Sequence, residues 1–128
     1  MKTYSIRSTS IILTLLLSLA GTASAAESFK IFDGFIAFKS LKLMDIDKAL
    51  GEISETNPSK LSPGDFNNIC VAYAISKDFS KAFEACSTAE VLAEATRGFP
   101  RAGLKDIKSN LSIIAGRAPS LAMISPKE

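Results

Sequence analysis

Residues 66–93, with the sequence FNNICVAYAISKDFSKAFEACSTAEVLA, decide the fold of this chain. Apolar and small residues recur there at helical spacing, pause at Ser76-Lys77-Asp78, and then resume. Asp78 suits the start of the second half because its carboxylate can accept a hydrogen bond from a free backbone N–H. The stretch therefore predicts two helices folded back on each other, with small residues where the helices approach.

Helix signals continue upstream of this hairpin. A one-sided apolar stripe covers residues 46–53, and Asp45 precedes it as an N-cap. Asn57-Pro58 ends that stripe because the residue before a proline disfavours helical backbone. The run Ser62-Pro63-Gly64-Asp65 then predicts the start of the first hairpin helix, with a capping serine, a proline at the first helical position and an acidic residue three positions after the cap.

Helix signals also follow the hairpin. Gly98 and then Pro100 end its second helix, in the order expected at a helix C-terminus. A third helix is predicted over residues 101–115, closed by Gly116, and a short fourth helix over residues 119–124. Helix after helix with short breaks predicts an all-α fold built as a short stack of antiparallel helix pairs.

Residues 27–42 carry a mixed pattern. Helical spacing of the apolar residues favours a helix, but Ile31, Phe35 and Phe38 also fit the preference of strands for aromatic and β-branched residues. Gly34 weakens both interpretations. We expect a helix, keep a strand as the alternative, and allow for an irregular N-terminal segment in the all-α fold.

The N-terminus has the layout of a secretory signal. Lys2 and Arg7 precede an apolar core over residues 10–20, and Ala23-Ser24-Ala25 supplies small residues for cleavage after Ala25. The core is shorter than the ~20 residues of a membrane span. We expect residues 1–25 to be removed and the protein to be periplasmic or secreted, without stable membrane insertion; an uncleaved anchor is the alternative.

Composition limits the chemistry of the mature chain, which we divide into one domain (residues 26–125) and a frayed tail (126–128). Loss of Lys2 and Arg7 leaves as many acidic as basic side chains, so nucleic acid is not an expected partner. The chain has no histidine, which removes histidine-based triads and metal sites, and it has no glycine-rich phosphate loop. We expect no cofactor, no metal and no enzymatic activity.

The two cysteines lie at matching heights on the predicted hairpin. Cys70 and Cys86 are about equally far from a turn at Lys77-Asp78, so their heights differ by roughly 2 Å. Closely packed helices bring facing Cα atoms to roughly 3.5–5.5 Å, which overlaps the range of about 4.4–6.8 Å that disulfides need. Exported chains enter an oxidising compartment, so we predict a Cys70–Cys86 disulfide; two buried free thiols are the alternative.

The hairpin resembles one tetratricopeptide repeat (TPR), a helix–turn–helix unit that stacks into a curved solenoid. The matching positions are Phe66 at the bulky position, Asn68-Ile69-Cys70 and Ala72-Tyr73 on the first helix, Lys77-Asp78-Phe79 at the turn, and Ala82, Cys86 and Ala89 on the second helix. Lys77 replaces the usual glycine, which predicts a left-handed lysine, and the closing proline is missing, which predicts a helix running to about Thr96. Residues 44–49 and 109–112 resemble parts of degenerate flanking repeats.

The resemblance implies a function in protein–protein interaction. In this family the first helices of each pair line a concave surface, which places Asn67, Val71 and Ala74 on it here. These side chains lack the basic clamp that some members use for a peptide carboxylate. The expected function is an exported, non-catalytic scaffold for an unidentified protein or peptide. The alternative is a structural or stress-related envelope protein that acts by self-association.

Overall fold

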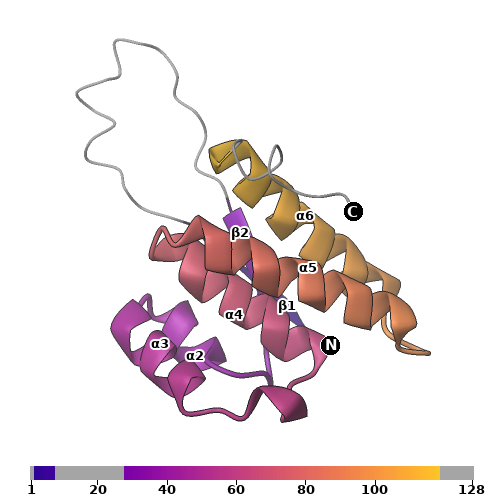
Figure 1. Ribbon diagram of the computed structural model, residues 1–128, viewed down its shortest axis with the longest axis horizontal. Helices are drawn as coiled ribbons and strands as arrows, with labels where there is room; N and C mark the ends of the chain where they lie inside the picture. Colours follow the sequence, from indigo (N-terminus) through magenta and orange to yellow (C-terminus); the bar gives the residue numbers. More distant parts are fainter. Residues whose placement is uncertain (1, 8–27, 119–128) are drawn as a thin grey trace.

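The structure of the protein is a computed structural model that describes residues 2–7 and 28–118 (Figure 1). Its helices are α2 (Phe38–Lys42), α3 (Ile46–Ser54), the 3-10 turn η2 (Pro58–Lys60), α4 (Pro63–Ile75), α5 (Phe79–Ala95) and α6 (Arg101–Arg117), and its strands are β1 (Thr3–Arg7) and β2 (Ser28–Phe32). The sequence predicts an all-α fold, and the described part confirms this as far as a mainly α-helical class. The two strands add a small antiparallel sheet to it.

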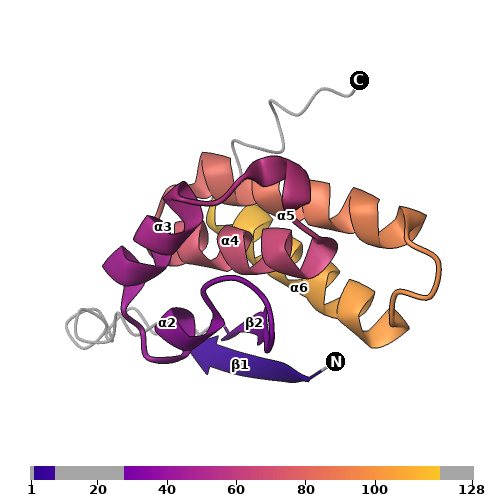
Figure 2. The ribbon, with the colours of Figure 1, turned by 90° about the horizontal axis from the view of Figure 1, so that it is seen from below.

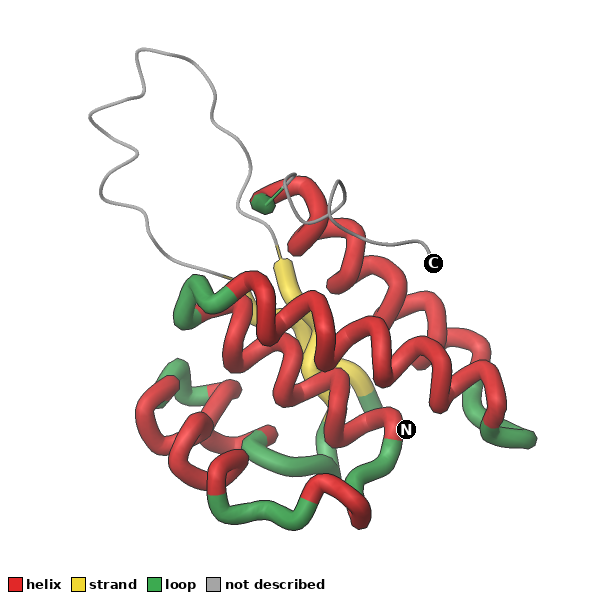
Figure 3. The backbone as a smooth tube through the Cα atoms, viewed as in Figure 1, coloured by secondary structure: helices red, strands yellow, loops and turns green. Residues whose placement is uncertain are grey.

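Helix α4 lies at the centre of the described part. It packs against α5, α3, β2 and α6, and most of its residues are buried. Helix α5 contacts both α4 and α6, so these three form the helical layer of the molecule. Figure 2 shows β2 between the helices and β1, and Figure 3 shows both strands running behind the helices. The core therefore lies around α4, between the helical layer and the sheet.

The predicted N-caps are confirmed. The side chains of Asp45, Ser62 and Asp78 each accept a hydrogen bond from the backbone N–H three residues further along the chain. Asp65 completes the capping box, since its Oδ2 accepts from the Ser62 N–H at 2.9 Å. Its Oδ1 accepts from the Ile36 N–H, also at 2.9 Å. One carboxylate thus both starts α4 and ties the segment before α2 to it.

Residues 27–42 divide between the two conformations that the sequence left open. The helix prediction is wrong for Ser28–Phe32, which is β2, and confirmed for Phe38–Lys42, which is α2. Turns separate them, where Gly34 has a φ of 92° and Ala37 a φ of 61°. A continuous helix cannot pass through these left-handed positions.

The N-terminal residues pair with β2 in the full chain. In the antiparallel register, Tyr4 lies opposite Ile31 and Ile6 opposite Phe29. Strand β1 therefore falls within the segment expected to be removed as a signal. The apolar core of that signal, its cleavage site, the fourth helix expected over residues 119–124 and the tail at 126–128 lie outside the described residues. In the described part, no helix is both long enough and apolar enough to cross a membrane.

The turn between α4 and α5 contains the expected left-handed lysine. Lys77 has a φ of 69°, and the Asp78 N–H closes the turn by donating to the Tyr73 carbonyl oxygen at 2.9 Å. Helix α5 ends at Ala95, close to the expected Thr96, and α6 runs to Arg117, slightly beyond the predicted end.

Replacing Lys77 with glycine is expected to raise the free energy of unfolding by about 0.5 kcal/mol. Relief of left-handed strain, about 1–2 kcal/mol, exceeds the entropy that glycine adds to the unfolded chain, about 0.4–1 kcal/mol. Urea denaturation followed by circular dichroism measures the difference. Lys105→Gly on the exposed side of α6 is the matched control and should lower stability by about 1 kcal/mol. A Lys77→Gly variant as unstable as this control would contradict the explanation.

Candidate peptide-binding surface

Three buried asparagines face β2. Asn67 and Asn68 lie on α4 and Asn110 on α6, and none of the three side chains is accessible to solvent. We call this group the asparagine clamp. A buried amide is stable only if its donors and acceptor are paired, so the partners of the clamp explain why these residues are on otherwise apolar helix faces.

The clamp holds the backbone of β2 at Lys30. The Lys30 N–H donates to Asn110 Oδ1 at 2.9 Å. The Lys30 carbonyl oxygen accepts from Asn67 Nδ2 at 2.9 Å and from Asn110 Nδ2 at 3.0 Å. Asn110 Nδ2 also donates to Asn67 Oδ1 at 2.8 Å. Two helices are thereby joined through one residue of the strand.

Asn68 holds the strand and the following turn. Its Oδ1 accepts from the Phe32 N–H at 2.9 Å, and its Nδ2 donates to the carbonyl oxygens of Phe32 and Ile36, both at 3.0 Å. A side-chain amide presents the same donor and acceptor as a peptide group. The clamp therefore takes the place of a neighbouring strand along one edge of β2. In the described part of the chain, no buried side-chain polar atom lacks a hydrogen-bond partner.

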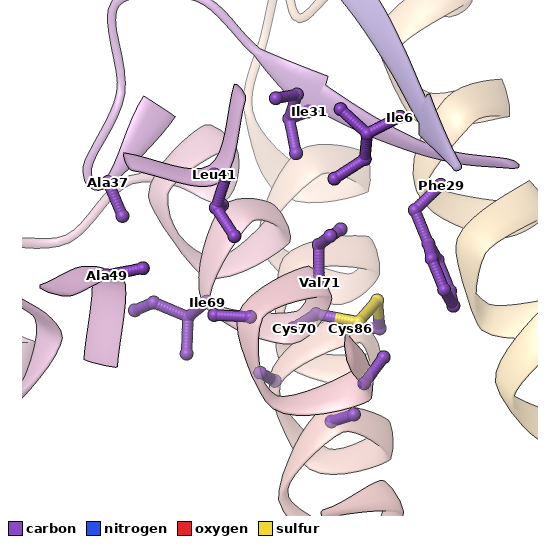
Figure 4. Packing of buried hydrophobic residues seen from close by; sticks show 14 of the residues in the cluster. Ile6, Phe29, Ile31, Ala37, Leu41, Ala49, Ile69, Cys70, Val71 and Cys86 are labelled. Atoms are coloured by element: carbon purple, nitrogen blue, oxygen red, sulfur yellow. A yellow bond between two sulfur atoms is a disulfide. The ribbon is translucent and has the colours of Figure 1, made fainter. Parts of the chain in front are cut away.

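Apolar packing fixes the side chains of β2 on both faces. Phe29, Ile31 and Phe32 are fully buried. Phe29 and Ile31 belong to the cluster around α4, and Figure 4 shows Val71 of α4 directed toward Ile31 and toward Ile6 of β1. Phe32 points into a second cluster formed by residues of α5 and α6. Strand β2 is thus an extended segment that the helices hold by both backbone and side chains.

Two of the residues predicted to line a concave surface, Asn67 and Val71, lie against this strand. Asn67, Val71 and Ala74 are fully buried, so none of them is open to a ligand in the described chain. Asn67 does contact an extended segment, but that segment is β2 of the same chain. The sequence analysis placed Asn68 and Asn110 within the repeat pattern but did not predict that their side chains bond a strand. The signal that could have found them is an asparagine within a helix face that is otherwise apolar.

The predicted disulfide is confirmed. Cys70 on α4 and Cys86 on α5 are bonded, with a Cα–Cα distance of 5.2 Å. Both residues are fully buried and lie in the same cluster as Val71. The disulfide therefore joins α4 to α5 directly behind the surface that carries β2 (Figure 4).

The described residues hold no group of three histidine, cysteine, aspartate or glutamate side chains placed to bind a metal ion. The asparagine clamp is an intramolecular contact in which α4 and α6 hydrogen-bond the backbone of β2. Compared with protein-family models, curated proteins and solved structures, the chain has no match.

Proposed function

We propose that this protein is an exported, non-catalytic protein-interaction module of TPR-like construction. One observation carries the proposal: α4 and α6 hold the backbone of an extended segment through three buried asparagines. The clamp itself is filled by β2, and by holding that segment extended it suits a scaffold that adds further extended polypeptide to the opposite edge of the strand.

The arrangement of the helices supports the TPR-like part of the proposal. Helices α4 and α5 form an antiparallel pair around a tight turn at Lys77, and α6 packs against α5 as the first helix of a following pair would. Asn68 and Asn110, which stand at the asparagine positions of the resemblance, both bond the same strand.

The export part rests on two features. The disulfide is consistent with an oxidising, extracytoplasmic compartment. The basic start, the apolar core and Ala23-Ser24-Ala25 fit a signal that is removed after Ala25. In this proposal the mature protein begins at Ala26 and acts in the periplasm or outside the cell.

The test is expression of the full chain with a C-terminal tag, followed by cell fractionation, intact-mass measurement and chemical crosslinking in the envelope. We expect a protein that starts at Ala26, has no alkylatable thiol before reduction, and forms a discrete crosslinked complex with another protein. Leu15→Arg, which places a charge in the apolar core of the signal, is the control and should remain cytoplasmic, reduced and without that complex. An exported protein that forms no crosslinked complex would contradict the proposed function in protein interaction.

Self-association is the second candidate, because the outer face of α5 carries an apolar patch. Val91 is 64% exposed there, and it lines a shallow hollow with Phe83 and Leu92. Size-exclusion chromatography with light scattering separates the two functions. A mass that rises to that of a dimer with concentration, and falls back in Val91→Ser, would favour self-association.

A further inference from the structure

Strand β2 has two edges with different occupants. Within a strand, the N–H and C=O groups of successive residues point to opposite edges. Lys30 and Phe32 bond the asparagine clamp, so Phe29 and Ile31 direct their backbone groups to β1. The Asp33 N–H continues this side by donating to the Lys2 carbonyl oxygen at 3.2 Å. We call the backbone groups of Phe29, Ile31 and Asp33 the outer edge.

The side chains of β1 also fit the molecule. Ile6 is only 8% exposed and belongs to the cluster around α4. The Tyr4 ring lies 5.1 Å from the Phe38 ring, and Lys42 Nζ lies 4.7 Å from the centre of the Tyr4 ring. Between them, Ser5 Oγ accepts a hydrogen bond from Lys30 Nζ at 3.0 Å. A strand paired with the outer edge therefore finds apolar contacts for two of its side chains, at Tyr4 and Ile6, and a hydrogen-bond partner for one polar side chain, at Ser5.

Removal of the signal during export would take β1 away from the outer edge. Residues 3–7 belong to the segment that the proposed signal cleavage removes, whereas β2 and the whole asparagine clamp remain. The clamp contacts β2 without involving β1, so β2 keeps its position on the helices after β1 is lost. The mature protein then presents unpaired backbone groups at the outer edge, together with the opened site of Ile6.

We propose that the outer edge of β2 in the mature protein binds an extended segment of a partner protein, which takes the place of β1. This inference rests on the proposed function and adds its binding surface and the chemistry of its partner. The partner segment is an antiparallel strand with an aromatic residue in the place of Tyr4, a polar residue in that of Ser5 and an aliphatic residue in that of Ile6. Addition of a strand to an exposed edge is a common way to bind peptides.

A second copy of this chain is a poorer occupant of the edge. The antiparallel register that overlaps all of Ser28–Phe32 with the same strand of another copy places Lys30 opposite Lys30. Like charges directly opposite each other destabilise a strand pair. In β1 the same place is taken by Ser5, which accepts a hydrogen bond from the lysine.

The test uses the processed protein purified from the envelope and a synthetic peptide of residues 2–8 as the probe. Isothermal titration calorimetry should show one-to-one binding of this peptide. The peptide with Ile6→Asp should bind at least about tenfold more weakly, because burial of the isoleucine is lost. The full chain is the matched protein control and should bind neither peptide, since its own β1 occupies the edge at a high effective concentration.

Amide hydrogen exchange followed by NMR locates the binding residue by residue. In the processed protein we expect slow exchange at Lys30 and Phe32, which donate to the clamp, and fast exchange at Phe29, Ile31 and Asp33. Added peptide should slow the exchange of the last three amides only. Three results would overturn the proposal. They are fast exchange at all five amides, no response to the peptide, and protection that rises with protein concentration in the absence of peptide.

The two proposals fail in different ways. A protein that keeps residues 1–25 or stays in the cytoplasm contradicts the proposed function, whatever the peptide does. A correctly processed, disulfide-bonded protein with a crosslinked partner but no peptide binding contradicts only the strand-addition proposal.

Discussion

Replacing Asn68 with alanine is expected to lower the free energy of unfolding by about 4 kcal/mol. The change leaves the N–H and carbonyl of Phe32 and the carbonyl of Ile36 without their partner, and each unpaired buried group costs about 1–3 kcal/mol. Because small domains have total stabilities of about 5–15 kcal/mol, we expect a large drop in the urea midpoint, measured by circular dichroism.

Asn57→Ala is the matched control for this experiment. Asn57 is exposed and its side chain accepts only from Ser59, at the start of η2. Loss of such a cap costs about 1 kcal/mol. If the two variants were equally stable, the asparagine clamp would not be the main attachment of β2. A stable Asn68→Ala protein in which the amide of Phe32 still exchanges slowly would lead to the same conclusion.

Removing the disulfide by the double change Cys70→Ala and Cys86→Ala is expected to lower stability by about 3 kcal/mol. The bond closes a loop with a sequence separation of 16 residues, and in the chain-entropy model a loop of this size restricts the unfolded chain by about that amount. Urea denaturation with and without reductant gives the difference.

Reductant supplies the internal control for the disulfide. It should destabilise the original protein by nearly as much as the double substitution does, and it should leave the double variant unchanged. Both cysteines are fully buried, so the alanine variant also loses some packing and should be slightly less stable than the reduced protein. An original protein whose unfolding is insensitive to reductant would show that the bond does not form in solution.

The Asn68→Ala and the double cysteine substitutions test two attachments of α4, one to β2 and one to α5. The disulfide fixes α4 against α5, and the asparagine clamp fixes β2 against α4 and α6. If both hold, the strand remains in place after β1 is removed, which the proposed strand addition requires. A clamp that fails in the Asn68→Ala variant should therefore also abolish binding of the peptide of residues 2–8.

The helices and their ends could be predicted from the sequence because their signals are local. Asp45, Ser62 and Asp78 each cap a helix through a backbone N–H only three residues away. The disulfide also followed from local information, since Cys70 and Cys86 flank one tight turn and helical rise sets their heights. The left-handed Lys77 was expected from the resemblance, because the repeat usually has glycine at this position.

The strand and the clamp could not be predicted in this way. The sequence of Ser28–Phe32 suits either a helix or a strand. Its backbone hydrogen-bond partners decide for the strand, and these partners lie far along the chain. Lys30 bonds Asn110 across a separation of 80 residues, and Phe32 bonds Asn68 across 36. For the same reason Asn67, Val71 and Ala74 were expected to be open, whereas all three are buried, and β2 lies against Asn67 and Val71.

The sequence by itself therefore determined the helical hairpin, its caps and its disulfide, because each depends on spacing within one or two neighbouring helices. Only the tertiary structure decided that β2 lies across α4 and α6 and that β1 covers its outer edge. Those pairings join backbone groups to partners from distant segments, and no local pattern records which distant partner a backbone N–H or carbonyl will find.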